Sequence, residues 1–146
     1  MIEVQAERVI ERPIEEVFDF MARLEELPSW LVGCRRAWSV HGDPREAGSR
    51  VAHEDEFMGT RFETQFDVVE WVDNERMVFE AISGPMRGRS VETFEPDGGE
   101  ATIVRIHVTG QLSGPLKAAN WIARRAAQAQ LDESLDNLKD LLEAGA

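Results

Sequence analysis

The sequence contains one cysteine, two lysines and no tyrosine among its 146 residues. The single cysteine, Cys34, excludes a disulfide within the chain and any metal site built from several cysteines. Long apolar runs are also missing: none approaches the roughly 18 residues of a membrane span. The N-terminus is charged from Glu3 onward and does not resemble a signal peptide. We therefore expect a cytoplasmic protein without stable insertion in a membrane.

Positive charge is scarce relative to negative charge. Lysine and arginine total 16 against 28 aspartates and glutamates, which gives a net charge of −12. Phosphate backbones would be repelled, so we expect no nucleic-acid partner. Hydrophobic residues nevertheless make up 42% of the chain, which excludes a disordered acidic segment. This length and composition predict one domain, residues 1–146, with a core of its own.

Turn residues divide the chain into segments with the spacing of strands and helices. Pro13 opens a short helix, a second short helix contains Trp30, and a long helix extends from Pro115 to about Glu143. Strands are predicted at 2–11, 34–41, 49–58, 61–72, 75–83, 88–95 and 101–111. Their short connections make consecutive strands antiparallel. The prediction is an α+β domain in which the long helix packs across an antiparallel sheet. The apolar stripe of that helix consists of Leu116, Ala123, Ala127, Leu131, Leu135, Leu138 and Leu142.

Hairpin geometry predicts which side chains share the sheet face that meets the helix. A turn at Gly59-Thr60 would place Phe57 opposite Phe62. A turn formed by residues 96–99 would place Thr93 on the same face, and Trp71 is expected on the other face. The predicted inner face includes His53, Asp55, Phe57, Thr64, Phe66, Met77, Phe79, Arg89, Val91 and Thr93.

Several residues of this predicted inner face are polar, and Asn120 lies beside the apolar stripe of the long helix. An unpaired polar group in a core costs about 1–3 kcal/mol. We therefore expect these groups to pair with one another, to line a hydrated cavity, or both. Arg89 keeps its charge, so it should either pair with an acid such as Asp55 or hold an anionic group of a ligand.

Two stretches of the chain carry a resemblance to a known superfamily. The stretch VIERPIEEVFDFMARLEELPSWLVG is similar to its strand, proline and two short helices, and GPLKAANWIARRAAQAQLDESLDNLKDLLEAG is similar to its closing helix. The chain resembles the START-like, birch-pollen-allergen-like helix-grip proteins (SRPBCC), in particular the polyketide cyclase/dehydrase and lipid-transport family. The resemblance implies a curved seven-stranded antiparallel sheet that clamps a long helix around an apolar cavity. It transfers no catalytic motif to individual residues.

Candidate chemistry centres on His53 and Asp55, which lie two apart on the predicted inner face. Such a pair can perform general acid–base work near neutral pH, with Arg89 holding an enolate or carboxylate. The alternative is a structural hydrogen-bonded cluster. The histidines have no metal-ligand spacing, and the glycine-containing segment 84–88 is no nucleotide-binding loop. We therefore expect no metal and no cofactor.

Three functions are compatible with the sequence. The first is binding of a small hydrophobic or amphipathic ligand, such as a lipid, isoprenoid or polyketide-like molecule, by a monomer or homodimer. The second is a polyketide cyclase or dehydratase that uses the same cavity. The third is a co-chaperone-like protein-interaction module. The residues expected to contact a ligand are Trp30, Phe57, Thr64, Phe66, Met77, Phe79, Met86, Val91, Thr93 and Asn120.

Overall fold

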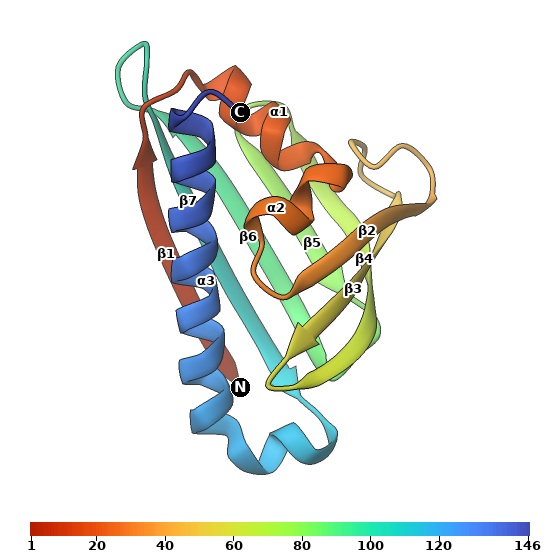
Figure 1. Cartoon of the computed structure of the whole chain (residues 1–146). Coiled ribbons are helices and arrows are strands. Elements are labelled where there is room, and N and C mark those ends of the chain that lie inside the picture. Colours follow the sequence, from red (N-terminus) through yellow and green to blue (C-terminus); the bar gives the residue numbers. More distant parts are fainter.

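The computed structural model describes residues 1–146, with all side chains except those of Pro115 and Leu116. Leu116, one residue of the predicted helical stripe, therefore lies outside the described side chains. Seven strands form one antiparallel sheet in the order β1-β7-β6-β5-β4-β3-β2 (Figure 1). The strands are β1 (Ile2–Ile10), β2 (Cys34–His41), β3 (Arg50–Phe57), β4 (Thr60–Val72), β5 (Arg76–Ala81), β6 (Met86–Pro96) and β7 (Thr102–Leu112). All seven predicted strands are confirmed.

The helices lie where the turn signals placed them. α1 (Ile14–Ala22) follows Pro13, and a short 3-10 turn, η1 (Leu24–Glu26), leads into α2 (Leu27–Trp30). The long C-terminal helix differs from the prediction at its start. Its first part is a 3-10 helix, η2 (Gly114–Ala119), and the α-helix α3 spans the 24 residues Asn120–Glu143. None of the described helices is long and apolar enough to cross a membrane.

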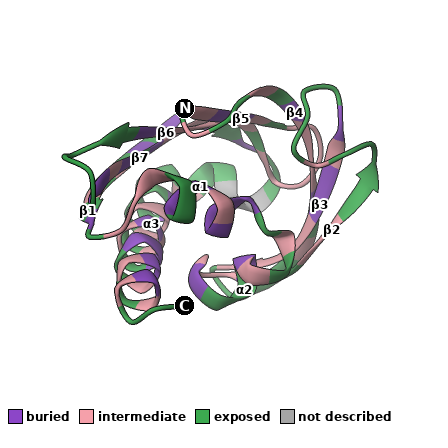
Figure 2. Ribbon diagram, turned by 90° about the horizontal axis from the view of Figure 1, so that it is seen from above, coloured by how far each residue is buried: buried purple, intermediate pink, exposed green. Residues whose placement is uncertain are grey.

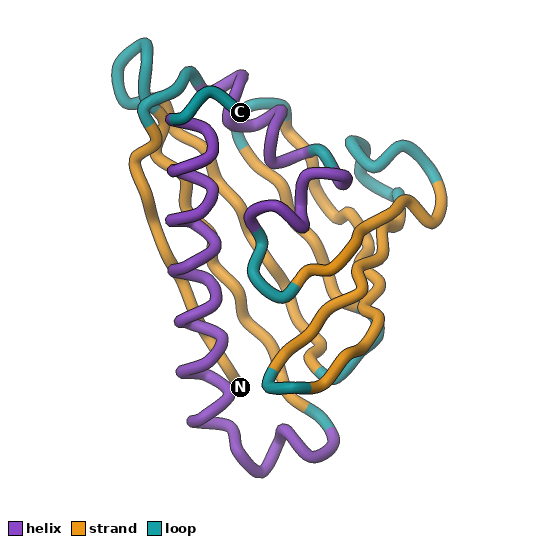
Figure 3. Tube along the Cα trace, in the orientation of Figure 1, coloured by secondary structure: helices purple, strands orange, loops and turns teal.

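The curved sheet holds α3 on its concave side, which is the helix-grip arrangement expected from the resemblance. Figure 2 shows the strands curving around α1 and α3, and Figure 3 shows α3 running alongside β1. Leu135 and Leu138 of α3 are completely buried because they face the sheet. An exposed hydrogen bond also links β1 to α3, since Nε of Arg8 donates to the Asp136 carboxylate at 2.8 Å.

The β3–β4 hairpin confirms the predicted faces and corrects the predicted partners. The turn is Met58-Gly59, with positive φ angles of 52° and 79°, so it begins one residue earlier than expected. Phe57 therefore pairs with Thr60 and His53 with Thr64. The partners differ from the prediction by two residues. Because side chains alternate with a period of two, each one stays on its predicted face.

The β4–β5 hairpin contains two irregularities that offset each other. Its turn has one residue more than predicted, since Val72 pairs with Arg76, and a bulge interrupts the pairing between Val68 and Glu70. Met77 and Phe79 consequently keep their predicted inner positions. The bulge reverses the alternation at Trp71, whose ring packs edge-on against Phe18 of α1 with centroids 5.4 Å apart. The prediction that Trp71 faces outward is wrong for this reason.

The β6–β7 hairpin overturns one predicted face. Pro96 pairs with Thr102, so five residues connect the strands in place of the expected four. Thr93 therefore pairs with Arg105, three residues from the partner that the predicted turn gives it, and any odd change of register moves every side chain of a strand to the opposite face. Glu92 and Phe94 therefore lie on the inner face, opposite Ile106 and Val104. The residues placed inside by prediction, Arg89, Val91 and Thr93, lie on the outer face.

Candidate functional site

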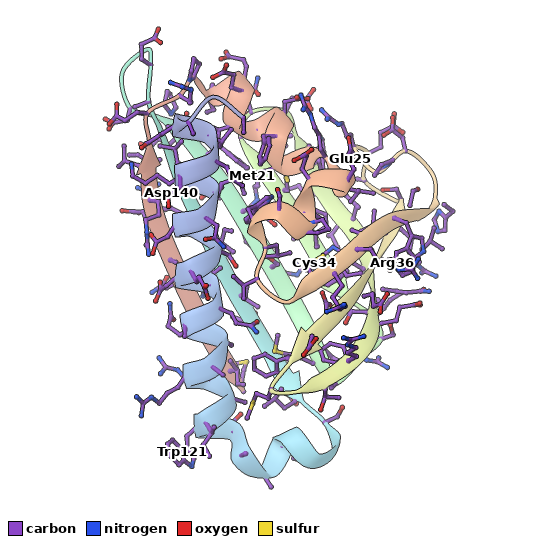
Figure 4. All side chains as sticks on the ribbon, in the orientation of Figure 1. Met21, Glu25, Cys34, Arg36, Trp121 and Asp140 are labelled. Atoms are coloured by element: carbon purple, nitrogen blue, oxygen red, sulfur yellow. The ribbon has the colours of Figure 1, made fainter. Side chains whose placement is uncertain are left out.

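A cavity of about 290 Å³ lies between the concave face of the sheet and the helices. Strands β3 to β7 form its floor, α1 and α2 contribute Met21 and Trp30, and α3 contributes Leu131. Most of its wall is apolar. The aromatic side chains of the wall are Trp30, Phe57, Phe62, Phe66, Trp71 and Phe79. Figure 4 labels Met21 and Cys34 among the side chains near α1, α2 and β2, far from Trp121 at the start of α3.

Most residues expected to contact a ligand line this cavity. They are Trp30, Phe57, Thr64, Phe66, Met77, Phe79 and Met86. The structure does not bring the other three to it. Val91 and Thr93 lie on the outer face because of the longer β6–β7 connection. Asn120 is exposed at the first residue of α3, away from the cavity wall.

His53 and Asp55 face the cavity as a loosely associated pair. His53 Nδ1 lies 3.7 Å from an Asp55 carboxylate oxygen, and the two side chains are 14% and 21% exposed. Burial lowers the pKa of His53 to about 4. Burial also raises the pKa of Asp55 to about 6, against an opposing hydrogen bond from Thr64. At neutral pH the pair therefore consists of a neutral imidazole and a carboxylate whose pKa lies close to the ambient pH.

Cys34 lies beside this pair at the start of β2. Its Sγ atom, a nitrogen of His53 and a carboxylate oxygen of Asp55 lie within 4.8 Å of one another. Burial, and next the charge of Asp55, raise the pKa of the Cys34 thiol to about 12. The thiol is thus protonated and is a poor nucleophile. Among the described residues, these three side chains are close enough together to bind one metal ion. Such an ion would have to displace the proton of the Cys34 thiol, whose raised pKa makes this unfavourable.

Glu92 is the inward-facing acid that the sequence analysis missed. It lies on β6 between Met77 of β5 and Ile106 of β7, and all three side chains line the cavity. Burial alone raises the pKa of Glu92 to about 7. Among the described side chains, none forms a hydrogen bond or an ion pair with its carboxyl group. Phe94 could have indicated this orientation from the sequence. It lies two positions from Glu92 and therefore on the same face of the strand, and an aromatic residue favours burial of the face that carries it.

The guanidinium of Arg89 does not enter the cavity. Arg89 contributes to the cavity wall, but its Nη2 pairs with a carboxylate oxygen of Glu80 at 2.9 Å on the outer face. Half of its side chain is exposed, at 50%. The prediction that Arg89 pairs with Asp55 or grips a ligand from inside is therefore wrong. The cause is again the connection between β6 and β7.

Trp30 of the cavity wall carries a buried polar atom without a partner. The residue is 2% exposed, and its indole Nε1 has no hydrogen-bond partner among the described residues. An unpaired buried donor of this kind costs about 1–3 kcal/mol. Helix α2 therefore carries a buried N–H donor that forms no hydrogen bond with the described residues of the core.

Comparison with models of known protein families identifies the family of this chain. The family model described as polyketide cyclase / dehydrase and lipid transport matches residues 1–143. The chain belongs to this family. Its description combines chemistry on polyketides with carriage of lipids, and both involve hydrophobic ligands. No curated protein sequence matches the chain.

Solved structures of similar shape cover nearly the full chain. The protein TTHA0849 from Thermus thermophilus is 26% identical, with a TM-score of 0.83 and 99% of both chains covered. A START superfamily protein from Mycobacterium smegmatis is 15% identical, with a TM-score of 0.73, over 97% of this chain and 94% of that one. The di-domain ARO/CYC protein BexL from the BE-7585A biosynthetic pathway is 19% identical, with a TM-score of 0.75; 98% of this chain and 47% of BexL are covered. The last two matches, at these identities, show a shared fold.

Proposed function

We propose that the protein binds a small hydrophobic or amphipathic ligand in the cavity between the sheet and α3. The observation that supports this most directly is the cavity itself, since about 290 Å³ is close to the lower end of the range typical of ligand pockets. Its wall is mostly aromatic and aliphatic, and a few polar groups converge on it from β3 and β6. This combination is typical of sites that bind an apolar body and orient one polar end.

A neutral fluorescent probe tests this function. N-phenyl-1-naphthylamine should bind the purified protein with a rise in fluorescence, and native mass spectrometry of the protein as isolated should detect a bound small molecule. Ala127 of α3 lines the cavity, whereas Ala129 is exposed on the same helix. Ala127→Phe should therefore weaken probe binding by roughly tenfold through loss of space, and Ala129→Phe should leave it unchanged. Equal behaviour of the two variants would contradict binding in this cavity.

A second candidate function is acid–base chemistry on a polyketide-like ligand. It is favoured by the cavity-facing Asp55, whose pKa of about 6 suits a general base near neutral pH. His53 would act beside it as a neutral hydrogen-bonding group. The test is exchange of the α-protons of 2-undecanone in deuterated buffer, followed by NMR. Catalysis predicts an acceleration by the protein that Asp55→Asn removes, whereas mere binding predicts no acceleration.

A further inference from the structure

The cavity is distinctive in the sign of its charged groups. Its ionisable inward-facing side chains are His53, Asp55 and Glu92. Burial lowers the pKa of His53 to about 4, so this imidazole is neutral at physiological pH. Of the inward-facing side chains that the structure describes, the two acids are left to carry charge within the cavity. Both of these acids are on the floor of the cavity, Asp55 on β3 and Glu92 on β6.

Two other charged residues belong to the wall but direct their charged ends elsewhere. Arg89 pairs with Glu80 on the outer face at 2.9 Å. Glu56 pairs with Arg35 and with Arg61 at 3.4 Å each, also away from the cavity. In the part of the chain that the structure describes, no lysine or arginine therefore offers its charge to a ligand inside. An anionic ligand group would find no cationic partner.

The elements packed around Glu92 do not supply a counter-charge either. Its strand neighbours on the inner face are Met77 of β5 and Ile106 of β7. Toward α1, the next inner residue of β6 is Phe94, which packs against Phe18 with ring centroids 4.8 Å apart. The face that α3 turns to the cavity is uncharged and consists of Ala127, Gln130, Leu131 and Ser134. Of the described ionisable groups that direct their charged ends into the cavity with Glu92, the others are His53 and Asp55.

We propose that the cavity accepts ligands whose polar end is neutral or basic, such as a hydroxyl, a carbonyl or an amine, and rejects carboxylate-bearing amphiphiles such as fatty acids. This inference rests on the proposed ligand-binding function and specifies the ligand class. Two charges of the same sign in a site shielded from water repel each other far more strongly than in solution. An amine reverses the sign of that interaction, and a hydroxyl can hydrogen-bond to either form of the Glu92 carboxyl group.

The experiment compares three ligands that share a hydrocarbon chain and differ in the polar end. Decylamine, 1-decanol and decanoate compete with N-phenyl-1-naphthylamine for the full-length protein at about pH 8.5, where Glu92 and Asp55 are both ionised. We expect decanoate to bind at least roughly tenfold more weakly than 1-decanol, and decylamine to bind at least as tightly as 1-decanol. At about pH 5.5 the penalty on decanoate should shrink, because Glu92 is then protonated while decanoate is still largely ionised.

Variants locate the source of the selectivity. Glu92→Gln should improve decanoate binding at the higher pH by roughly tenfold, and Asp55→Asn is a second variant at the other inward acid. Glu95→Gln is the matched control, because Glu95 lies on the same strand but pairs with Arg105 on the outer face at 2.7 Å. Circular dichroism confirms that each variant folds.

The outcomes separate the inference from the function on which it rests. Binding of decanoate as tight as that of 1-decanol overturns the inference and leaves ligand binding intact. Decanoate that stays weak when Glu92→Gln and Asp55→Asn are combined in one chain also overturns it, since neither inward acid would then be responsible. Failure of the fluorescent probe and of all three ligands to bind would instead refute the proposed function, and the inference with it.

Discussion

On the outer face of β6, Glu95 shares Arg105 of β7 with Glu7 of β1. Glu92, three positions earlier on the same strand, faces the cavity and pairs with no cation among the side chains that the structure describes. The same contrast holds across the sheet. Arg50 of β3 pairs with Asp67 at 2.8 Å on the outer face, while Asp55 of the same strand has a neutral histidine beside it. Glu95 and Asp67 on the outer face each pair with an arginine of a neighbouring strand, whereas among the described residues Glu92 and Asp55 on the inner face have no arginine or lysine partner.

The comparison shows that the same kind of residue has opposite consequences on the two faces. An exposed ion pair contributes about 0–1 kcal/mol, because water screens both partners. A carboxyl group that is partly buried without a cationic partner has a raised pKa instead, because no opposite charge compensates for the lost hydration. The inner acids therefore weaken the fold at neutral pH. The proposed ligand-binding function gives them a role, since they would meet the polar end of a ligand.

The largest expected effect tests which face of β6 is buried. Phe94→Ala should lower the free energy of unfolding by about 3–5 kcal/mol, because it leaves a cavity beneath α1. Thr93→Ala, one residue away on the outer face, should change it by less than about 1 kcal/mol. Urea denaturation monitored by tryptophan fluorescence measures both. A larger loss for Thr93→Ala would restore the face predicted from the sequence.

A pH series sharpens the contrast between the two glutamates of β6. Burial raises the pKa of Glu92 to about 7 in the folded protein, above the value of about 4.5 for an unperturbed glutamate. A raised carboxyl pKa destabilises the fold increasingly as the pH rises from the unfolded pKa to the folded one, and the penalty is complete above the folded pKa. Glu92→Gln should therefore be more stable than the wild type by roughly 3 kcal/mol at about pH 8 and equally stable at about pH 4.

The matched control for this series is again Glu95→Gln. Its stability should differ from that of the wild type by less than about 1 kcal/mol across the same pH range, because its ion pair is exposed. Thermal unfolding at several pH values measures both variants. A Glu92→Gln variant whose advantage did not grow with pH would show that the Glu92 carboxyl group is hydrated in the folded protein.

His53 should impose a pH dependence of the opposite kind. Burial lowers the pKa of His53 to about 4, below the value of about 6.5 for an unperturbed histidine. The fold is unaffected above the unfolded pKa and loses stability as the pH falls from about 6.5 toward about 4, where the unfolded chain takes up the proton first. His53→Gln should remove part of this acid sensitivity, by roughly 2–3 kcal/mol at about pH 4. Denaturation of both proteins at about pH 7 and about pH 4 checks it.

The smallest effect is expected at Arg89. Arg89→Met removes a half-exposed ion pair with Glu80, so it should cost less than about 1 kcal/mol in stability. It should also leave the ratio of decanoate to 1-decanol binding unchanged, because the guanidinium lies outside the cavity. A selective loss of decanoate binding in this variant would mean that the arginine reaches the ligand after all.

Much of the architecture follows from local patterns in the sequence. Alternating side chains and turn residues predicted all seven strands, and the leucine spacing predicted the face of α3 that packs on the sheet. The inner positions of β3, β4 and β5 at His53, Asp55, Phe66 and Met77 were predictable too. The turn at Met58-Gly59 differed from expectation by an amount that preserved the faces. In the next hairpin, the bulge offset the longer turn.

Only the tertiary structure decided the face of β6 and the orientation of Trp71. The face of β6 depends on one extra residue in the connection to β7, and the orientation of Trp71 depends on one extra residue in the bulge of β4. A single residue reverses every side chain beyond it, and no local pattern specifies whether a loop contains four residues or five. Packing settled the matter, because burying Phe94 against Phe18 requires Glu92 to face inward. The sequence thus determined that Glu92 and Phe94 share one face of this strand while Thr93 and Glu95 share the other, and the packed core decided which face a ligand would meet.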